Sequence, residues 1–146
     1  MAFPLENLNI KPEDIEKRIL TIAKEFSNTK ILDKKIENLT NSEKQELLIM
    51  ISLLHNPKIL LLDESFSMMN GITKDRVIKY LKKYYKNNKC TILSVTNDMD
   101  DILYGTHVII LKDGKVLIFD KTEEVLKNEK SFKEASLNLP FMSDLS

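Results

Sequence analysis

Three short, wholly apolar runs in the second part of the chain constrain its fold more than any other feature. They are KILLLD at 58–63, CTILSVT at 90–96 and HVIILK at 107–112, each bounded by polar turns. Strands buried on both faces lose the in-and-out alternation of a surface sheet, and parallel sheets are buried in this way. Helix-like segments separate the runs, which is typical of βαβ units. The sequence therefore predicts an α/β fold with a mainly parallel sheet.

Helical periodicity accounts for most of the remaining chain. Residues 11–26 place one apolar stripe on a predicted helix, and residues 42–56 continue as a second helix from Thr40, which forms a capping-box pattern with Glu43. A third helix is predicted over 73–88, and Asp113-Gly114 is a strong hairpin turn signal. The residues expected inward are Ile15, Ile19, Ile22, Ala23 and Phe26 in the first helix, Leu47, Met50, Ile51 and Leu54 in the second, and Val77, Leu81 and Tyr84 or Tyr85 in the third, with Thr73 as its cap.

Composition excludes several classes of function. The chain has 146 residues with 22 basic and 22 acidic side chains, so its net charge of zero gives no electrostatic argument for nucleic-acid binding. One cysteine and two histidines cannot make a disulfide framework or a structural zinc site. The apolar runs stop well short of the roughly 18 residues that a membrane span needs. We expect a cytoplasmic protein that reaches a membrane only through a partner.

The glycine content excludes a phosphate-binding loop within this sequence. Only Gly71, Gly105 and Gly114 are present. A P-loop needs two glycines five positions apart followed by Lys and Ser or Thr, and a dinucleotide fingerprint needs three glycines close together. If the protein handles a nucleotide, the loop that binds the phosphates belongs to a missing half or to a partner chain.

The first candidate site is the acidic pair Asp63-Glu64 at the end of the first apolar run. The carboxyl ends of parallel strands open into the ligand crevice of α/β proteins. Asp63 is therefore placed to hold Mg²⁺ while Glu64 polarises a water molecule. The alternatives are an acid pair that only caps the following turn, or a magnesium site of an unrelated doubly wound protein.

The second candidate is LTNSEKQ, residues 39–45, where a helix begins. Unpaired backbone N–H groups and the helix dipole make such a position an anion site. The alternative is a plain capping box that binds nothing.

The spacing of these segments resembles that of ABC transporter ATPases. The frame LTNSEKQELLIMISLLHNPKILLLDES places Asp63 24 residues after Leu39, the interval between the family's LSGGQ signature and its Walker B aspartate. The segment SFSMMNG lies at the D-loop position, SVTNDMDD at that of the switch histidine, and VIILKDGKVL at that of the closing hairpin. The opening FPLENLNIKPEDIEKRI and the ending LNLPFMSDLS are similar to the ATPase subunits of energy-coupling factor transporters, the cobalt and vitamin importers.

The resemblance covers only the second half of that family. It implies half of a P-loop NTPase core, with a mainly parallel sheet and an antiparallel edge hairpin, plus an α-helical subdomain. The implied divisions are a helical signature subdomain at 1–56, a core half with Walker B, D-loop and switch strand at 57–128, and a C-terminal extension at 129–146.

Several positions depart from the family pattern. Asn41 and Ser42 replace two glycines, and Glu43 replaces the usual glutamine. Asn70 replaces the D-loop aspartate, and Asn97 replaces the histidine that contacts the γ-phosphate. An amide donates a hydrogen bond but cannot carry the charge of a histidine.

By resemblance, the residues divide into three roles. Asp63 would hold Mg²⁺, while Glu64 and Asn97 would be the catalytic residues for a nucleotide on this domain's own missing P-loop. The residues expected to contact nucleotide held by a partner, which we call the signature segment, are Thr40, Asn41, Ser42 and Glu43, and the D-loop residue Asn70 would join them.

The implied function is that of a partial nucleotide-binding domain whose ATP hydrolysis powers transport. Without a P-loop, the chain is not expected to hydrolyse ATP alone, so both ATP and Mg²⁺ require the missing half or a partner chain. The expected partners are a second ABC ATPase domain or the missing N-terminal half, and a transmembrane transporter subunit that holds the protein at the inner face of the membrane. The alternative is a catalytically inactive docking or regulatory subunit of a transporter assembly.

Overall fold

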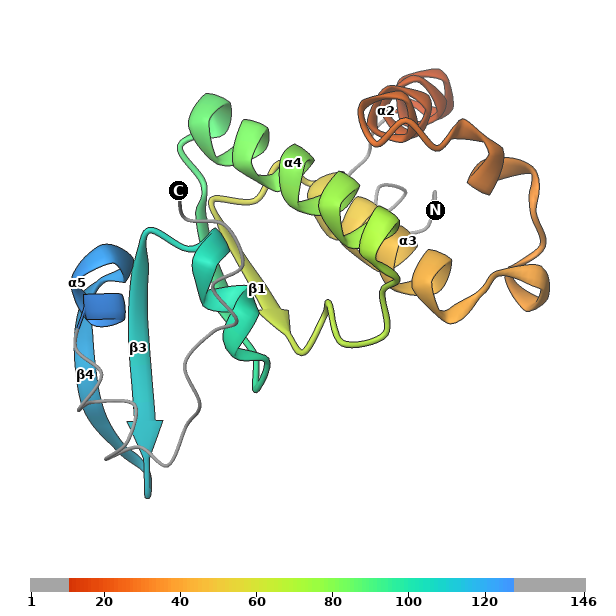
Figure 1. Ribbon diagram of the computed structural model, residues 1–146. Helices are drawn as coiled ribbons and strands as arrows, with labels where there is room; N and C mark the ends of the chain where they lie inside the picture. Colours follow the sequence, from red (N-terminus) through yellow and green to blue (C-terminus); the bar gives the residue numbers. More distant parts are fainter. Residues whose placement is uncertain (1–10, 128–146) are drawn as a thin grey trace. The chain divides into compact units, whose positions relative to one another are not determined.

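A computed structural model describes residues 11–127 of the chain, which divide after Val95 into two compact units (Figure 1). The first unit contains α2 (Pro12–Glu25), the 3₁₀ turns η1 (Thr29–Asp33) and η2 (Ile36–Asn38), α3 (Asn41–Leu53), β1 (Ile59–Asp63), α4 (Gly71–Asn88) and β2 (Thr91–Val95). The second contains η3 (Met99–Tyr104), β3 (His107–Lys112), β4 (Lys115–Lys121) and α5 (Thr122–Lys127). The mixed α/β fold predicted from the apolar runs is confirmed.

Strands β1 and β2 pair in parallel across the α4 crossover, as the sequence predicts for a βαβ unit. The register places Leu61 beside Leu93 and Asp63 beside Val95. Parallel strands need a crossover of a dozen or more residues, and α4 supplies 18. This pairing fixes where the acidic pair at the end of β1 lies.

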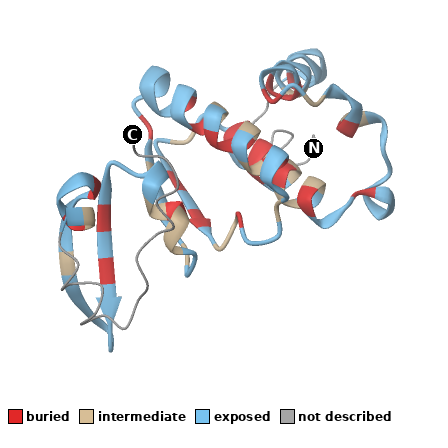
Figure 2. Ribbon diagram, in the orientation of Figure 1, coloured by how far each residue is buried: buried red, intermediate tan, exposed pale blue. Residues whose placement is uncertain are grey.

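The hydrophobic core of the first unit lies between the helices and one face of this strand pair (Figure 2). Helix α2 contributes the predicted stripe, with Ile15, Ile22, Ala23 and Phe26 buried and Ile19 partly buried. Pro12 lies in its first turn, where a missing N–H costs nothing. The periodicity of residues 11–26 was therefore sufficient to orient this helix.

Two details of the other helices differ from the sequence-based prediction. In α3 the buried positions are Ser42, Glu46, Ile49, Met50 and Leu53, so the buried face is rotated away from the expected Leu47 and Ile51, which are only partly buried. The rotation follows from Glu46, which is drawn inside by an ion pair. Helix α4 is capped by Asn70, whose side chain accepts from the Thr73 N–H, so Thr73 is an interior residue rather than the cap.

The expectation that the apolar runs are buried on both faces is wrong for the described chain. Leu60 and Leu62 are buried in β1, whereas Ile59 and Leu61 are 65% and 69% exposed. In β2 the neighbours on that same face, Leu93 and Val95, are also exposed. Within the described part of the first unit, residues 11–95, the helices cover one face only.

The second unit is an antiparallel hairpin packed against α5. The turn between β3 and β4 has positive φ at Asp113 (50°) and Gly114 (74°), as a two-residue type I′ turn requires. The predicted hairpin is confirmed, but it forms its own two-stranded sheet, so the described strands make two small sheets instead of one sheet with an edge hairpin. One face of the hairpin also exposes apolar side chains, namely Ile109, Leu111, Val116 and Phe119.

Other expectations concern segments beyond these elements. Helix α5 follows β4 directly, and the extension expected at 129–146 lies outside the described residues. Within residues 11–127 no helix combines the length and apolar character of a membrane span.

Adjacent leucines of β1 provide a test of which face is buried. Leu62→Ala should lower the free energy of unfolding by about 2–5 kcal/mol, because it opens a cavity in the core. Leu61→Ala should change it by no more than about 0.5 kcal/mol, because that side chain is already in water. Urea unfolding of both variants measures the difference, and equal losses would contradict the one-sided sheet.

Candidate functional site

The acidic pair lies where β1 ends. The Glu64 N–H donates to the Val95 carbonyl at 2.9 Å, which continues the β1–β2 ladder by one residue. Asp63, in register with Val95, is exposed. The carboxyl ends of both strands therefore meet at these two acids, as the sequence predicts.

Glu64 has an unusual backbone conformation. Its φ is 48°, in the left-handed region that side-chain-bearing residues seldom adopt. The Glu64 carbonyl accepts two hydrogen bonds from Ser67, from its N–H at 3.2 Å and its hydroxyl at 2.8 Å, and these fix the turn. Left-handed backbone costs about 1–2 kcal/mol for an L-residue. Such strain is concentrated at functional sites, where surrounding contacts hold a residue in place.

A metal ion would meet one carboxylate here, that of Asp63. Among residues 11–127 no three His, Cys, Asp or Glu side chains gather as a metal cluster. Mg²⁺ is commonly bound by one or two carboxylates together with substrate phosphates and water. An exposed Asp63 fits that use, provided that a nucleotide supplies the phosphates.

The signature segment forms the predicted capping box at the start of α3. The Glu43 N–H donates to Thr40 Oγ1 at 3.2 Å, and the Thr40 N–H donates to Glu43 Oε2 at 3.0 Å. Lys34 Nζ donates to Glu43 Oε1 at 2.5 Å. The hydrogen bond from Lys34, followed by that from the Thr40 amide, lowers the pKa of Glu43. The carboxylate is thus held by its own segment and by Lys34.

Ser42 and Asn70 are brought together although 28 residues separate them. The Asn70 N–H donates to Ser42 Oγ at 3.1 Å, and Ser42 is buried. The Asn70 carboxamide oxygen accepts from the Thr73 N–H at 2.9 Å. Both side chains therefore serve contacts within the first unit, although Asn70, like Thr40 and Asn41, is exposed.

Asn97 is an exposed residue of the second unit, in the loop between β2 and η3. Hydrogen bonds of neighbouring side chains shape this loop: the Thr96 hydroxyl donates to Asp101 Oδ2 at 2.9 Å and accepts from the Asp98 N–H at 3.0 Å. The loop thus has a defined local conformation of its own.

Sequence reasoning missed a buried ion pair beneath the signature segment. Glu46 is fully buried, and its carboxylate accepts from Arg76 Nε at 2.8 Å, from Arg76 Nη2 at 2.7 Å and from Asn28 Nδ2 at 2.8 Å. The available signal was an acidic residue one helical turn after Ser42 and one turn before Ile49 and Met50, on the same face of α3.

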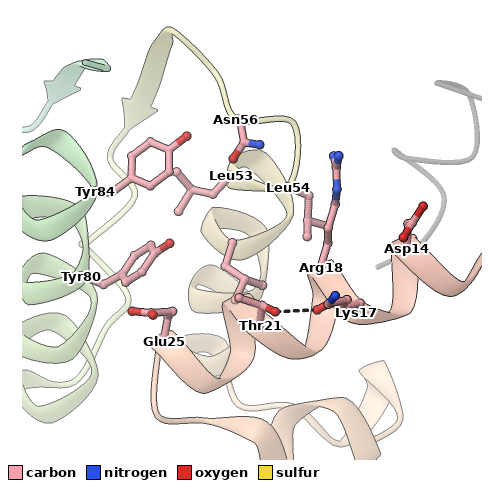
Figure 3. A pocket seen from close by; sticks show the side chains of 11 residues that line it. Asp14, Lys17, Arg18, Thr21, Glu25, Leu53, Leu54, Asn56, Tyr80 and Tyr84 are labelled. Atoms are coloured by element: carbon pink, nitrogen blue, oxygen red, sulfur yellow. Dashed lines mark hydrogen bonds between the residues drawn. The ribbon is translucent and has the colours of Figure 1, made fainter. Parts of the chain in front are cut away.

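One groove of the first unit lies away from these residues. It has a volume of about 460 Å³ and runs between α2, the end of α3 and α4 (Figure 3). It is lined by Leu53 and Leu54 at the end of α3, by Tyr80 and Tyr84 of α4, and by charged side chains of α2 that include Lys17, Arg18 and Glu25. Burial, assisted by Glu25, raises the pKa of Tyr80 to about 12. None of the predicted site residues lines this groove.

Comparison with known proteins shows what the chain is similar to. No family model matches the chain. The energy-coupling factor transporter ATP-binding protein EcfA1 of Mycoplasma mobile is 32% identical over 146 residues, covering 100% of this chain and 53% of that protein. The EcfA protein of Malacoplasma penetrans is 31% identical over the same 146 residues, which are 51% of its length. The chain thus spans about half the length of the curated relatives it matches.

Solved structures agree with the sequence comparison. The cbiO1 structure from Clostridium perfringens, part of the ABC transporter complex cbiONQ, matches 94% of this chain and 55% of its own with a TM-score of 0.77 and 26% identity. The ATP-binding cassette MJ0796, a dimer in a post-hydrolysis state bound to ADP and Pi, matches 77% of this chain and 49% of its own with a TM-score of 0.68 and 28% identity. The described fold therefore corresponds to part of an ABC cassette.

The strained backbone at Glu64 gives a first prediction for this site. Glu64→Gly should be more stable than Glu64→Ala, because both variants lose the same side chain and only alanine keeps the cost of the left-handed conformation, about 1–2 kcal/mol less about 0.4–1 kcal/mol for the freer unfolded glycine chain. At Asp63, in ordinary strand backbone next to it, the order should reverse, with the Asp63→Gly variant about 0.5–1 kcal/mol less stable than Asp63→Ala. Chemical denaturation of the four variants tests this, and the same order at both positions would mean that Glu64 is not strained.

The capping box gives a second prediction, on pH. Because the folded-state pKa of Glu43 is lowered from its ordinary 4.5, the stability it contributes is present above that value and is lost as pH falls through the folded-state pKa. Glu43→Gln keeps the capping box but removes the charge. The variant should therefore lose less stability than the wild type between about pH 5 and about pH 3.

The control for the pH prediction is Glu16→Gln, on the exposed side of α2. Unfolding measured at both pH values for the three proteins decides the matter. If the wild type and the Glu43→Gln variant lost the same stability between these pH values, the contact between Glu43 and Lys34 would contribute nothing to stability.

Proposed function

The chain is homologous to the ATP-binding proteins of energy-coupling factor transporters over about half of their length, and we propose that it supplies the Walker B half of an ABC-type cassette. In this proposal a second half brings the P-loop, and ATP hydrolysis by the complete cassette powers transport. The half described here contributes Asp63, Glu64 and a degenerate signature segment.

The observation that carries the proposal is the exposed apolar face of the β1–β2 pair. Ile59, Leu61 and Leu93 lie on the same face as Asp63 and Val95 by the register of the two strands. Fully burying one such side chain contributes about 1.5–3 kcal/mol. A polypeptide that covered this face would therefore bind it tightly and would lie next to Asp63.

The length of the relatives supports one choice of the polypeptide that covers this face, and these relatives are the homologous ATP-binding proteins. They contain roughly as much chain again as the part that matches. We infer that the additional half packs on the exposed faces of β1–β2 and of the β3–β4 hairpin. The two small sheets would then become parts of one mainly parallel sheet with an antiparallel edge, the expected core of a P-loop NTPase.

The residues at the end of β1 then take distinct roles. Asp63 would hold Mg²⁺, which neutralises phosphate charge when it is bound. Glu64 would orient or deprotonate the attacking water, and its rigid turn would limit the positions available to its carboxylate. Asn97 would donate a hydrogen bond to the γ-phosphate in place of a charged histidine.

The signature segment would contact nucleotide held by a second cassette. Its departures from the family pattern reduce what it offers to a phosphate. One N–H of the α3 terminus is already taken by Thr40, Glu43 adds negative charge there, and the Ser42 hydroxyl points inward to Asn70. We therefore propose that this half contributes weakly to the site in which it acts through Thr40–Glu43 and Asn70.

Partners and location follow from the same proposal. MJ0796 is a dimeric cassette, and cbiO1 belongs to a transporter complex. This chain would likewise meet a second ATPase domain and a transmembrane subunit, which would hold it at the cytoplasmic face of a membrane. Residues 1–56 would form the signature subdomain, 57–128 the core half and 129–146 an extension.

A second candidate function is that of a docking or regulatory subunit without catalysis. The observation that favours it is that Glu43, Ser42 and Asn70 are all engaged in local capping or packing contacts. In that case the exposed apolar faces would still bind a partner, but Glu64 would have no chemical role.

Reconstitution separates the two functions. The chain is mixed with a P-loop half taken from a homologous ATP-binding protein, together with the transporter partner, and phosphate release is measured. Glu64→Gln should lower hydrolysis by about 10²- to 10⁴-fold and leave ATP binding nearly unchanged, because it removes only the acid-base group.

Asn97→His is the matched variant in the opposite direction. It should raise hydrolysis, because it restores a donor that can carry charge beside the γ-phosphate. Equal rates for the wild type and both variants would replace the catalytic proposal with the docking one.

A further inference from the structure

We propose that Glu46 and Arg76 are positioning residues that lock the signature segment to the D-loop residue Asn70, so that the two move as one body. The contacts that form this lock all lie within the first unit. Its consequence for ATP hydrolysis rests on the proposed function.

The lock consists of two contacts on one face of α3. At the start of the helix, Ser42 Oγ accepts from the Asn70 N–H at 3.1 Å. One helical turn later the Glu46 carboxylate accepts both Arg76 donors, at 2.8 and 2.7 Å. Because Asn70 caps α4 and Arg76 lies within that helix, both contacts join the same two helices.

The two hydrogen bonds between Arg76 and Glu46 fix the orientation of the Glu46 carboxylate as well as its distance from Arg76. Two parallel hydrogen bonds from a planar guanidinium set the orientation of a carboxylate, which a lysine at the same place cannot do. Asn28 Nδ2 adds a third hydrogen bond, at 2.8 Å, to the oxygen that also faces Arg76 Nη2. The Glu46 side chain therefore has one orientation, and α3 has one rotation about its axis.

Stability alone is a poor explanation for this arrangement. The Glu46 carboxylate is fully buried and pays a large desolvation cost, while Arg76 keeps 28% of its side chain exposed. Well-packed apolar residues of similar volume often replace a buried pair without loss. The best-attested role of a buried ion pair is to specify how two elements are aligned. Here the alignment of α3 with α4 decides whether the Ser42 hydroxyl contacts the Asn70 N–H. It therefore also decides where the Thr40–Glu43 segment lies relative to Asn70.

The test is hydrogen exchange of single amides in the full 146-residue chain, followed by NMR. Ser42→Ala removes the acceptor directly and should speed exchange of the Asn70 amide by about 3- to 10-fold. Glu46→Gln and Arg76→Lys should produce the same acceleration at Asn70 while the β1 amides remain as slow as in the wild type.

Two further variants keep the test decisive. Glu46→Leu with Arg76→Leu is expected to stay folded and still to release the Asn70 amide, because packing is kept and orientation is lost. Glu25→Ala with Lys83→Ala removes an exposed ion pair between α2 and α4 and should leave Asn70 unchanged. An Asn70 amide that stays slow, or that speeds up only in step with the β1 amides, would overturn the lock.

A measurement of ATP hydrolysis distinguishes this inference from the proposed function. With a P-loop half supplied, the variant that combines Glu46→Leu with Arg76→Leu should bind ATP as the wild type does and show a lower kcat. Wild-type mixtures without hydrolysis would count against the proposed function, whereas the exchange result would still decide whether Glu46 and Arg76 lock the two segments.

Discussion

Packing on one face of a two-stranded parallel sheet is the constraint on which the rest of the first unit depends. Leu60 and Leu62 project from β1 into a core shared with α2, α3 and α4. Because side chains alternate along a strand, the same pairing that buries them presents Ile59 and Leu61 outward. Apolar side chains thus occupy both faces of this strand pair, and the helices of the first unit cover one of them.

The acids at the end of β1 take their place from the same pairing. The hydrogen bond from Glu64 to Val95 extends the ladder past Asp63, and the left-handed turn that follows is closed by Ser67. The uncovered apolar face ends at Asp63. The exposed apolar face of this strand pair therefore lies next to the two acids.

The sequence was enough to predict the elements and the acidic pair, because apolar runs, a capping box and an Asp-Gly turn are local signals. It failed where tertiary contacts override local pattern. Glu46 lies in the buried face of α3, where Arg76 and Asn28 satisfy its charge, whereas an acidic residue in a helix is ordinarily expected at the surface. The sequence also did not show that Asn70 caps α4 or that Ser42 accepts from the Asn70 N–H, 28 residues away. The expected contacts of both residues with nucleotide stay predictions.

The measurement that tests the central claim most directly is calorimetric titration of ATP with Mg²⁺ into the purified chain, alone and mixed with a P-loop half from a homologous ATP-binding protein. The account predicts no micromolar binding by the chain alone, since the backbone amides and lysine that hold the β- and γ-phosphates are absent from it, and tighter binding by the mixture than by the P-loop half alone. Micromolar binding by the 146-residue chain alone, or a mixture that binds no better than the P-loop half, would contradict it.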